Sequence, residues 1–387
     1  MNGSRQVKEL ALSEVEHLRI HGRTTGRRNP LTLFWTGSGV EFNARGAELW
    51  LEIETGYDFY EQWITVMINA VPVSRQMLPA GRHWVCIYRG MNAEKARNVQ
   101  VIKDVQAMSG DPGSFMSIHA VRFDGGFLPV EEKPCKLEFI GDSITSGEGA
   151  IGAKAEEDWI PMWFSAVHNY TAITAAAVNA EYRVISQSGW GVLTGWDNNP
   201  HTNLPAHYEK VCGLLRGEKN QALGAGEDND FAAWQPDVVV VNLGSNDGGA
   251  FFTPEWVDRE TGRTYKQRLL EDGSFHPEDL KAFEEAVVHF LGKLRTCNPQ
   301  AQIVWAYGML GRVMMPAIYR AVDAYMAQSG DRNVSVFQLP NMTEETAGSR
   351  SHPGLLAHQE AARALAGYLK ELLPERTSGE NIELNLY

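Results

Sequence analysis

The chain has 387 residues, of which 43% are hydrophobic, and a formal net charge of -13 at pH 7. That length allows two domains, each with a full hydrophobic core. Because no stripe rich in lysine and arginine is visible, the composition argues against nucleic acid and anionic membrane surfaces as partners. The segment Met1–Gln6 leads into no long apolar run, and no run in the sequence is long enough to cross a bilayer. The sequence as given therefore predicts a cytoplasmic protein.

The first part of the chain alternates polar and apolar residues between turns rich in glycine, asparagine, aspartate and proline. A period of two is typical of strands, and the spacing of the turns favours an antiparallel β-sandwich, or jelly-roll. One helix-like insertion is expected over 92–99. The clearest alternating segments are 48–53, 63–69, 83–88 and 116–123.

The later part of the chain alternates strand-like apolar runs with helical patterns, which predicts a parallel sheet flanked by helices. We therefore expect one domain over 1–132 and a second over 133–387, with a linker at Glu131–Pro134. On the last predicted helix, His358 is expected to face solvent. The expected strands are 136–140, 183–187, 237–243, 302–307 and 333–338, and the expected helices are 163–180, 278–296, 316–328 and 355–373.

The first strand of the second domain, Leu137–Ile140, is followed directly by Gly141-Asp142-Ser143-Ile144. This pattern indicates a buried strand that ends in a tight turn. In open α/β sheets, reacting groups collect at the carboxyl ends of the strands, so Ser143 is placed where chemistry is expected. The tetrapeptide alone is weak support, because small polar residues are ordinary turn formers.

Three further blocks follow in order along the chain. The run 184–188 ends at Gly189, the run 238–243 leads into Gly244-Ser245-Asn246-Asp247, and Ser351-His352-Pro353-Gly354 precedes the last helix. With the block around Ser143, they resemble the SGNH (GDSL-type) hydrolase family. The resemblance implies a flavodoxin-like SGNH domain with a central parallel sheet flanked by helices.

A jelly-roll domain that precedes an SGNH domain along the chain indicates resemblance to a narrower family. The domain order, the segment Glu138–Thr145 and the block Ser188-Gly189-Trp190-Gly191 resemble carbohydrate esterase family 2. This implies a serine esterase that removes O-acetyl groups from acetylated saccharides, such as xylo-oligosaccharides or other plant-type oligosaccharides, through an acyl-enzyme. An acetylated oligosaccharide or a small ester is the expected partner, and no cofactor is expected.

Ester cleavage requires a nucleophile, a base that takes its proton and donors for the tetrahedral oxyanion. Ser143 is the candidate nucleophile and His352 the candidate base. The candidate oxyanion donors are the backbone N–H of Ser143, the backbone N–H of Gly189 and the side-chain amide of Asn246, with Gly191 as a rival to Gly189.

One departure concerns the third member of the catalytic triad. The wider family carries an aspartate three residues before the histidine, and this chain has Ser349 there. A serine cannot stabilise an imidazolium as a carboxylate does. We therefore expect a Ser143–His352 dyad whose imidazole ring is held by a backbone carbonyl, a serine or a water. Glu344 and Glu345 lie upstream, and either one within hydrogen-bond reach of the ring would make the site a triad instead.

Two acids and one indole complete the expected site. Asp142 and Asp247 are expected to support their own turns by hydrogen bonds, and Trp190 is expected to contact the substrate. The histidines show no spacing typical of a metal site, so no metal is expected.

The missing aspartate leaves another class of function open, a carbohydrate-binding SGNH protein with weak or lost turnover. A third possibility is an SGNH lipase or thioesterase, which would require a long apolar groove for its acyl chain. The fold does not choose among these functions, because function resides in the site. The sequence does not specify the sugar, the acetylated position or the oligomeric state.

Overall fold

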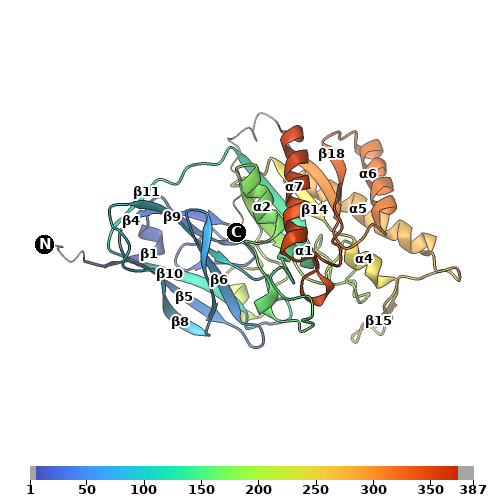
Figure 1. The fold of residues 1–387 in the computed structure, drawn as a ribbon. Coiled ribbons are helices and arrows are strands. Elements are labelled where there is room, and N and C mark those ends of the chain that lie inside the picture. Colours follow the sequence, from blue (N-terminus) through green and yellow to red (C-terminus); the bar gives the residue numbers. More distant parts are fainter. Residues whose placement is uncertain (1–5, 374–387) are drawn as a thin grey trace. The chain divides into compact units, whose positions relative to one another are not determined.

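The computed structural model describes residues 6–373, which form two compact units (Figure 1). The first unit runs up to Glu132 and also includes the later segments Trp159–Val167 and Lys210–Asn229. The second comprises Lys133–Asp158, His168–Glu209 and the chain from Asp230 onward. Of the segment Met1–Gln6, on which the expectation of no leader rests, residues 1–5 lie outside the described range.

The first unit is built almost entirely of strands. Its strands are β1 (Lys8–Ala11), β2 (Arg19–His21), β3 (Leu31–Thr32), β4 (Gly39–Arg45), β5 (Leu49–Gly56), β6 (Gln62–Ile68), β7 (Val71–Leu78), β8 (Gly81–Tyr88), β9 (Ala96–Lys103), β10 (Phe115–Phe123) and β11 (Gly126–Leu128). Its short helices are η1 (Leu12–Glu14), η2 (Pro161–Trp163) and α3 (Glu218–Ala222).

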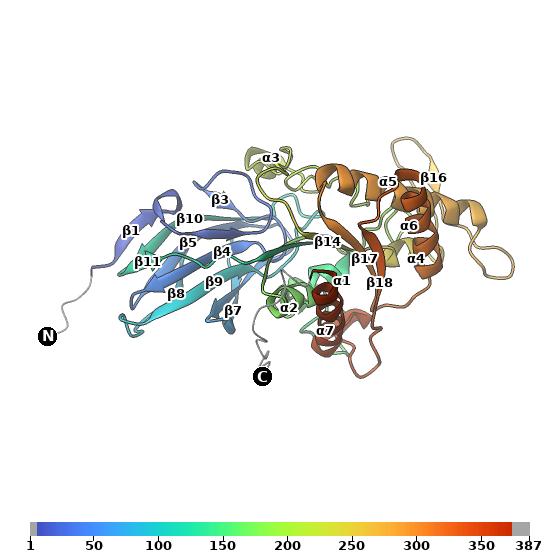
Figure 2. The same ribbon diagram turned by 90° about the horizontal axis from the view of Figure 1, so that it is seen from above.

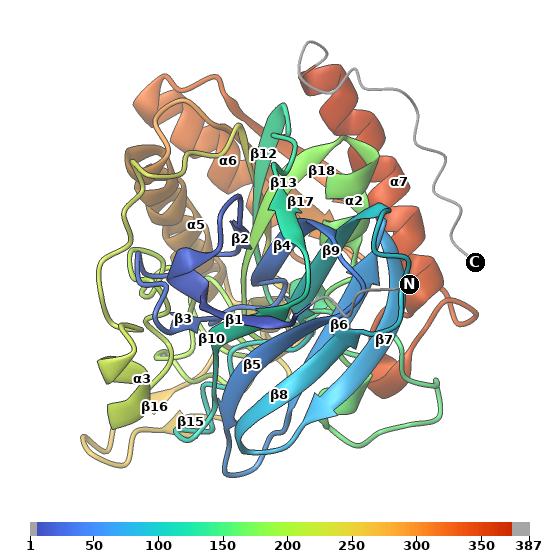
Figure 3. The same cartoon turned by 90° about the vertical axis from the view of Figure 1, so that its left-hand side faces the viewer.

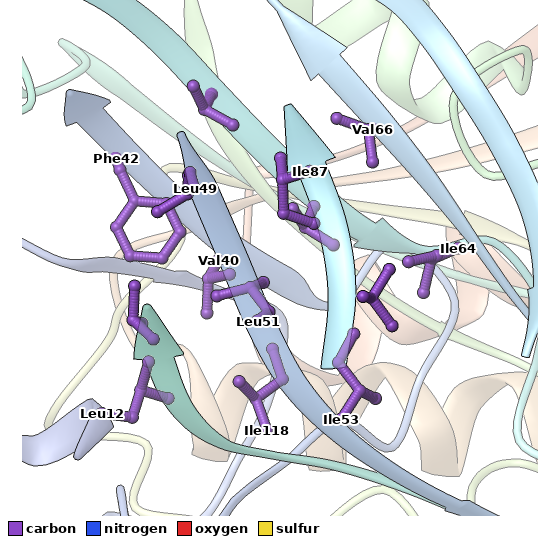
Figure 4. Close-up of a cluster of buried hydrophobic side chains, with 14 of the residues drawn as sticks. Leu12, Val40, Phe42, Leu49, Leu51, Ile53, Ile64, Val66, Ile87 and Ile118 are labelled. Atoms are coloured by element: carbon purple, nitrogen blue, oxygen red, sulfur yellow. The ribbon is translucent and has the colours of Figure 1, made fainter. Parts of the chain in front are cut away.

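These strands pair antiparallel in two sheets (Figure 3). One sheet has the order β1-β10-β5-β8 with β3 beside β10, and the other has the order β11-β4-β9-β6-β7 with β2 beside β4. Strand β5 shows the expected alternation, since Leu49, Leu51 and Ile53 are buried and the residues between them are half-buried. Side chains from both sheets meet in one apolar core (Figure 4), which confirms the predicted sandwich.

The second unit alternates strands and helices. Its strands are β12 (Cys135–Gly141), β13 (Ala180–Ser186), β14 (Val238–Asn242), β17 (Gln302–Gly308) and β18 (Val334–Leu339), with a small hairpin of β15 (Trp256–Val257) and β16 (Thr264–Tyr265). Its helices are α1 (Ser143–Ser146), α2 (Tyr170–Ala177), α4 (Ser245–Ala250), α5 (Pro277–Cys297), α6 (Met315–Ser329), η3 (Ser349–Ser351) and α7 (Leu355–Leu372).

The five main strands of this unit form a parallel sheet in the order β13-β12-β14-β17-β18. Helices α2 and α7 cover one face of the sheet, and α5 and α6 cover the other (Figure 2). A sheet covered on both faces requires apolar strands, which explains the fully buried valine run of β14. The predicted flavodoxin-like arrangement is confirmed, and the ends of β12, β13 and β14 lie at one edge.

Three local predictions are wrong. The expected helix over 92–99 is a turn followed by β9, because Val99 and Val101 alternate into the sandwich core. The expected helix over 163–180 shrinks to α2, which begins after Asn169, whose side chain caps it by accepting the Thr171 N–H. His358, which was expected to face solvent, is fully buried.

Within residues 6–373, none of the helices combines the length and apolar character that crossing a membrane requires.

Candidate active site

The turn after β12 places Ser143 at the carboxyl edge of the parallel sheet. Asp142 caps α1, because its Oδ1 accepts the Ile144 N–H at 3.1 Å. Ser143 is therefore the first residue of α1, and only 7% of its surface is exposed. The expectation that Asp142 supports its own turn agrees with this contact.

The structure brings His352 and Ser143 together. His352 follows η3, and its Nε2 lies 2.9 Å from Ser143 Oγ. The other ring nitrogen, Nδ1, lies 2.8 Å from the backbone carbonyl oxygen of Arg350. A carbonyl only accepts, so Nδ1 carries the proton of the neutral ring and Nε2 is free to accept from the serine hydroxyl.

The three upstream residues considered as partners of the ring do not hold it through their side chains. The Ser349 carbonyl accepts the His352 backbone N–H at 3.1 Å, whereas the buried Ser349 Oγ makes no hydrogen bond within the described residues. Glu344 is exposed and pairs with Lys154 at 2.8 Å. Glu345 accepts a hydrogen bond from the Thr343 hydroxyl at 3.1 Å.

A carboxylate that sequence reasoning missed lies beside the histidine. Glu148 is 3% exposed, and its Oε1 lies 3.8 Å from His352 Nε2 and 3.1 Å from Arg350 Nε. The only signal in the sequence is its place in Gly147-Glu148-Gly149, close behind the nucleophile. A glutamate between two glycines in a loop has no distinctive pattern, so the sequence did not single it out.

Gly189 and Asn246 come from the ends of the two neighbouring strands. Gly189 follows β13 in a left-handed conformation, with φ of 80°, which favours glycine. Asn246 lies in α4, where its Nδ2 donates to the Trp190 carbonyl at 2.9 Å and to Asp142 Oδ2 at 3.2 Å. Both amide hydrogens of Asn246 are thus engaged, and the contact to Asp142 is the longer of the two.

Asp247 holds the loop after Gly189 and not only its own turn. Its carboxylate accepts the backbone N–H groups of Val192, Leu193 and Thr194 at 2.9, 2.8 and 3.1 Å. Burial raises the pKa of Asp247 even though these N–H groups oppose the shift. The sequence expected this acid to act within its own loop, and the structure extends its contacts to the loop that carries Trp190.

Burial also dominates the other acid at this edge, since it raises the pKa of Asp142 to about 7. The hydrogen bond from Ile144 opposes the shift, whereas the nearby carboxylates of Asp247 and Glu148 add to it.

Among the described residues, no group of three or more histidine, cysteine, aspartate or glutamate side chains is arranged to hold a metal ion.

The indoles of this region differ in exposure. Trp190 is 8% exposed, and its ring packs against His207 with a centroid distance of 5.2 Å. Trp196, six residues on, is 55% exposed, and its backbone N–H donates to the Gly189 carbonyl at 3.1 Å. A Cβ built on Gly189 would lie 3.0 Å from Trp196 Cδ1, so this exposed indole lies directly against Gly189.

The chain resembles proteins of known fold and function over most of its length. The family model described as GDSL-like lipase/acylhydrolase matches residues 139–369. An acetyl xylan esterase from the rumen bacterium Butyrivibrio proteoclasticus is 45% identical, with a TM-score of 0.94 over 95% of this chain and 99% of that chain. A family two carbohydrate esterase from Clostridium thermocellum, solved in complex with cellohexaose, is 25% identical, with a TM-score of 0.76 over 92% of this chain and 99% of that chain.

Two curated relatives show the same resemblance in sequence. An acetylxylan esterase/glucomannan deacetylase of Cellvibrio japonicus is 25% identical over 363 residues, which are 92% of this chain and 89% of the relative. A cellulase/esterase of Acetivibrio thermocellus is 26% identical over 346 residues, or 88% of this chain. The match spans only 37% of the length of that second relative.

Proposed function

Since the chain belongs to the GDSL-like lipase/acylhydrolase family of carboxylic ester hydrolases, we propose that it is a serine esterase that removes O-acetyl groups from acetylated saccharides. The observation that carries the proposal is the 2.9 Å contact between Ser143 Oγ and His352 Nε2, with Nδ1 turned to a backbone carbonyl. The acetylated substrate is supported by the relatives, whose names specify acetyl xylan and glucomannan.

In the acylation step, Ser143 Oγ attacks the acetyl carbonyl carbon and its proton passes to His352 Nε2. The carbon–oxygen double bond opens to a tetrahedral oxyanion. When the intermediate collapses, the bond to the sugar oxygen breaks and that oxygen takes the proton from Nε2. The products are the free sugar hydroxyl and an acetyl ester on Ser143.

In the deacylation step, a water attacks the acetyl ester and gives a proton to His352 Nε2. Collapse of the second tetrahedral intermediate breaks the bond to Ser143 Oγ, which recovers the proton. Acetate leaves, and the dyad returns to its starting protonation state. The Arg350 carbonyl keeps the proton on Nδ1 throughout, so the reacting nitrogen is always Nε2.

The oxyanion is assigned to the N–H groups of Ser143 and Gly189 and to the amide of Asn246. Since both Asn246 hydrogens are engaged, one contact must be exchanged for the oxyanion. The 3.2 Å bond to Asp142 Oδ2 is the weaker one, and the 2.9 Å bond to the Trp190 carbonyl fixes the amide in place. Asp142 then loses a donor only while the intermediate exists.

For the sugar we assign Trp196 as a stacking surface, because its indole is 55% exposed and lies against Gly189. Trp190 was the residue expected from the sequence to contact substrate. With 8% exposure its ring offers little face to a sugar, whereas its carbonyl orients Asn246.

The test is acetate release from acetylated xylo-oligosaccharides and from p-nitrophenyl acetate, by the wild type and by Ser143→Ala. We expect turnover by the wild type only, and a steep fall in rate from acetyl to octanoyl esters. Binding of the oligosaccharide without acetate release would instead support a carbohydrate-binding protein. Comparable rates on acetyl and octanoyl esters would support a lipase or thioesterase.

A further inference from the structure

Building on the proposed esterase function, we propose that Glu148 is a positioning residue that takes over both tasks of the missing aspartate. It holds the Arg350 turn that orients His352, and its buried charge stabilises the imidazolium from the Nε2 side of the ring. The two tasks follow from two separate sets of contacts.

The loop that carries Glu148 is pressed against the loop that carries the histidine. The Glu148 N–H donates to the Ser143 carbonyl at 3.0 Å, and the Ser349 N–H donates to the Gly149 carbonyl at 3.3 Å. A Cβ built on Gly149 would lie 2.5 Å from the Ser349 carbonyl oxygen and 2.8 Å from His352 Cβ. This close approach requires glycine at 149 and fixes Glu148 beside the histidine.

Arg350 has a backbone conformation that needs outside support. Its φ is 55° and that of Ser351 is 54°, both in the left-handed region that non-glycine residues rarely adopt. The Arg350 side chain donates to the Glu148 carboxylate at 3.1 Å and to the Glu157 carbonyl at 2.9 Å. The Arg350 backbone N–H donates to the Glu156 carbonyl at 2.8 Å. This conformation turns the Arg350 carbonyl toward His352 Nδ1, so Glu148 orients the ring through Arg350.

The second task is electrostatic. In the neutral ring, Nε2 accepts from the Ser143 hydroxyl. During attack it gains the serine proton, and a positive charge forms 3.8 Å from Glu148 Oε1. Because the carboxylate is 3% exposed, solvent screens this attraction poorly. The Arg350 cation opposes part of it, so the gain is smaller than that of a carboxylate hydrogen-bonded to the ring.

Burial opposes the ionisation of the other acids and of the second histidine near the dyad, and it raises the pKa of Asp247. Burial lowers the pKa of His358, on α7, to about 3, so it is neutral at neutral pH. Burial raises the pKa of Asp142 to about 7, so it is only partly ionised there. Because Glu148 and Arg350 carry opposite charges beside His352, their removal should change the stability of the imidazolium in opposite directions.

The experiment compares Glu148→Gln, Glu148→Asp and Arg350→Gln with the wild type on p-nitrophenyl acetate. The matched control is Glu344→Gln, which removes an exposed carboxylate from the segment ahead of the histidine. We expect Glu148→Gln to lower kcat about 10- to 100-fold, less than the about 10⁴-fold that neutralising a triad acid costs. Glu148→Asp should recover part of the loss, and Glu344→Gln should stay within about twofold, as for surface charges.

The pH dependence separates an electrostatic from a purely structural role. Loss of the carboxylate disfavours the imidazolium, so the acid limb of kcat/KM should move to lower pH in Glu148→Gln. Loss of the guanidinium should move it to higher pH in Arg350→Gln. The pH midpoint of the His352 imidazole resonances, followed by NMR, should shift in the same two directions, including in a Ser143→Ala background without turnover.

Unchanged midpoints, or shifts of the same sign in both variants, would overturn the electrostatic task. Wild-type rates in Glu148→Gln would overturn the whole assignment. An inactive wild type would instead contradict the proposed esterase function. The NMR titration would still report on Glu148 in that case, so the two failures are distinguishable.

Discussion

Two buried charged groups of the sandwich unit, Lys103 and Asp111, contact a different kind of partner from the buried acids of the α/β unit. Both contact backbone groups of nearby turns. The Lys103 ammonium donates to the carbonyls of Val105 and Gln106 at 2.6 and 2.8 Å. The Asp111 carboxylate is fully buried and accepts the backbone N–H groups of Asp58, Phe59, Tyr60 and Gly113. Such contacts hold loops in place.

In the α/β unit, buried carboxylates gather around a hydroxyl and an imidazole. Asp142, Glu148 and Asp247 follow the ends of β12 and β14, and Ser143 and His352 lie among them. Here burial raises the pKa of Asp142 and Asp247, so their ionisation is opposed by the fold. Burial of a charge alone therefore does not mark a functional site. Its position at the carboxyl edge of a parallel sheet, beside a nucleophile and a base, does so.

Loss of the dyad should reduce activity more than any other change to this site. Ser143→Ala and His352→Ala should each lower kcat on acetyl esters by about 10⁴-fold or more, because neither group works without the other. Circular dichroism and the melting temperature should be close to those of the wild type. Retention of more than a few per cent of activity in either variant would contradict the assignment.

A smaller loss is expected from the oxyanion site. Asn246→Ala should lower kcat about 10²- to 10³-fold with little change in KM, because the amide acts on charge that forms only in the transition state. Steady-state kinetics with a full substrate titration checks this. If KM rose and kcat stayed constant, Asn246 would be binding the ground state and the oxyanion role would fail.

The parts of the site that were predictable share one physical reason. Parallel strands bring their carboxyl ends to one edge, so short blocks far apart in the sequence had to meet once the strands were recognised. Ser143, Gly189 and Asn246 follow such strands, and their roles and that of His352 were expected from the resemblance to the SGNH family. The sandwich followed from its period of two. Each depends on a local pattern attached to a regular element.

The remainder depends on loops, whose paths the sequence pattern does not specify. Glu148 reaches His352 only because two glycine-containing loops approach closely at Gly149. The segments Trp159–Val167 and Lys210–Asn229 belong to the first unit although they follow strands of the second. The exposure of Trp196, against the burial of Trp190, likewise depends on how one loop folds back.

In the sandwich unit, the buried acid Asp111 should affect stability and leave turnover unchanged. Asp111→Asn should lower the free energy of unfolding by about 3 kcal/mol, because an amide cannot accept N–H donors on both of its ends. The kcat of the folded variant should stay within about twofold of the wild type, as for a residue without contact to the dyad. Urea unfolding and kinetics on the same preparation test both statements. A loss of kcat with unchanged stability would assign Asp111 a role in catalysis.

The smallest effect concerns His358, which the sequence placed on the surface of α7 and which is fully buried. Its Nδ1 accepts the Tyr170 N–H at 3.2 Å, and its ring stacks on the Tyr170 ring. Burial lowers the pKa of His358 to about 3, with the nearby His352 adding to the shift. The folded protein therefore keeps this imidazole neutral at pH values where the unfolded chain, titrating near 6.5, takes up a proton.

Between about pH 6.5 and pH 3 the unfolded state binds more protons at this position, so stability falls as the pH falls. From pH 8 to pH 5 the loss from His358 should be about 2 kcal/mol. His358→Asn keeps an acceptor for the Tyr170 N–H but cannot titrate, so the stability gap between wild type and variant should shrink by that amount at pH 5. Urea unfolding at the two pH values measures the gap, and the exposed His289→Asn, also on a helix, is the matched control. A stability gap that stays constant would show that His358 takes up a proton in the folded protein as it does in the unfolded chain. His358 would then not be a neutral residue near His352.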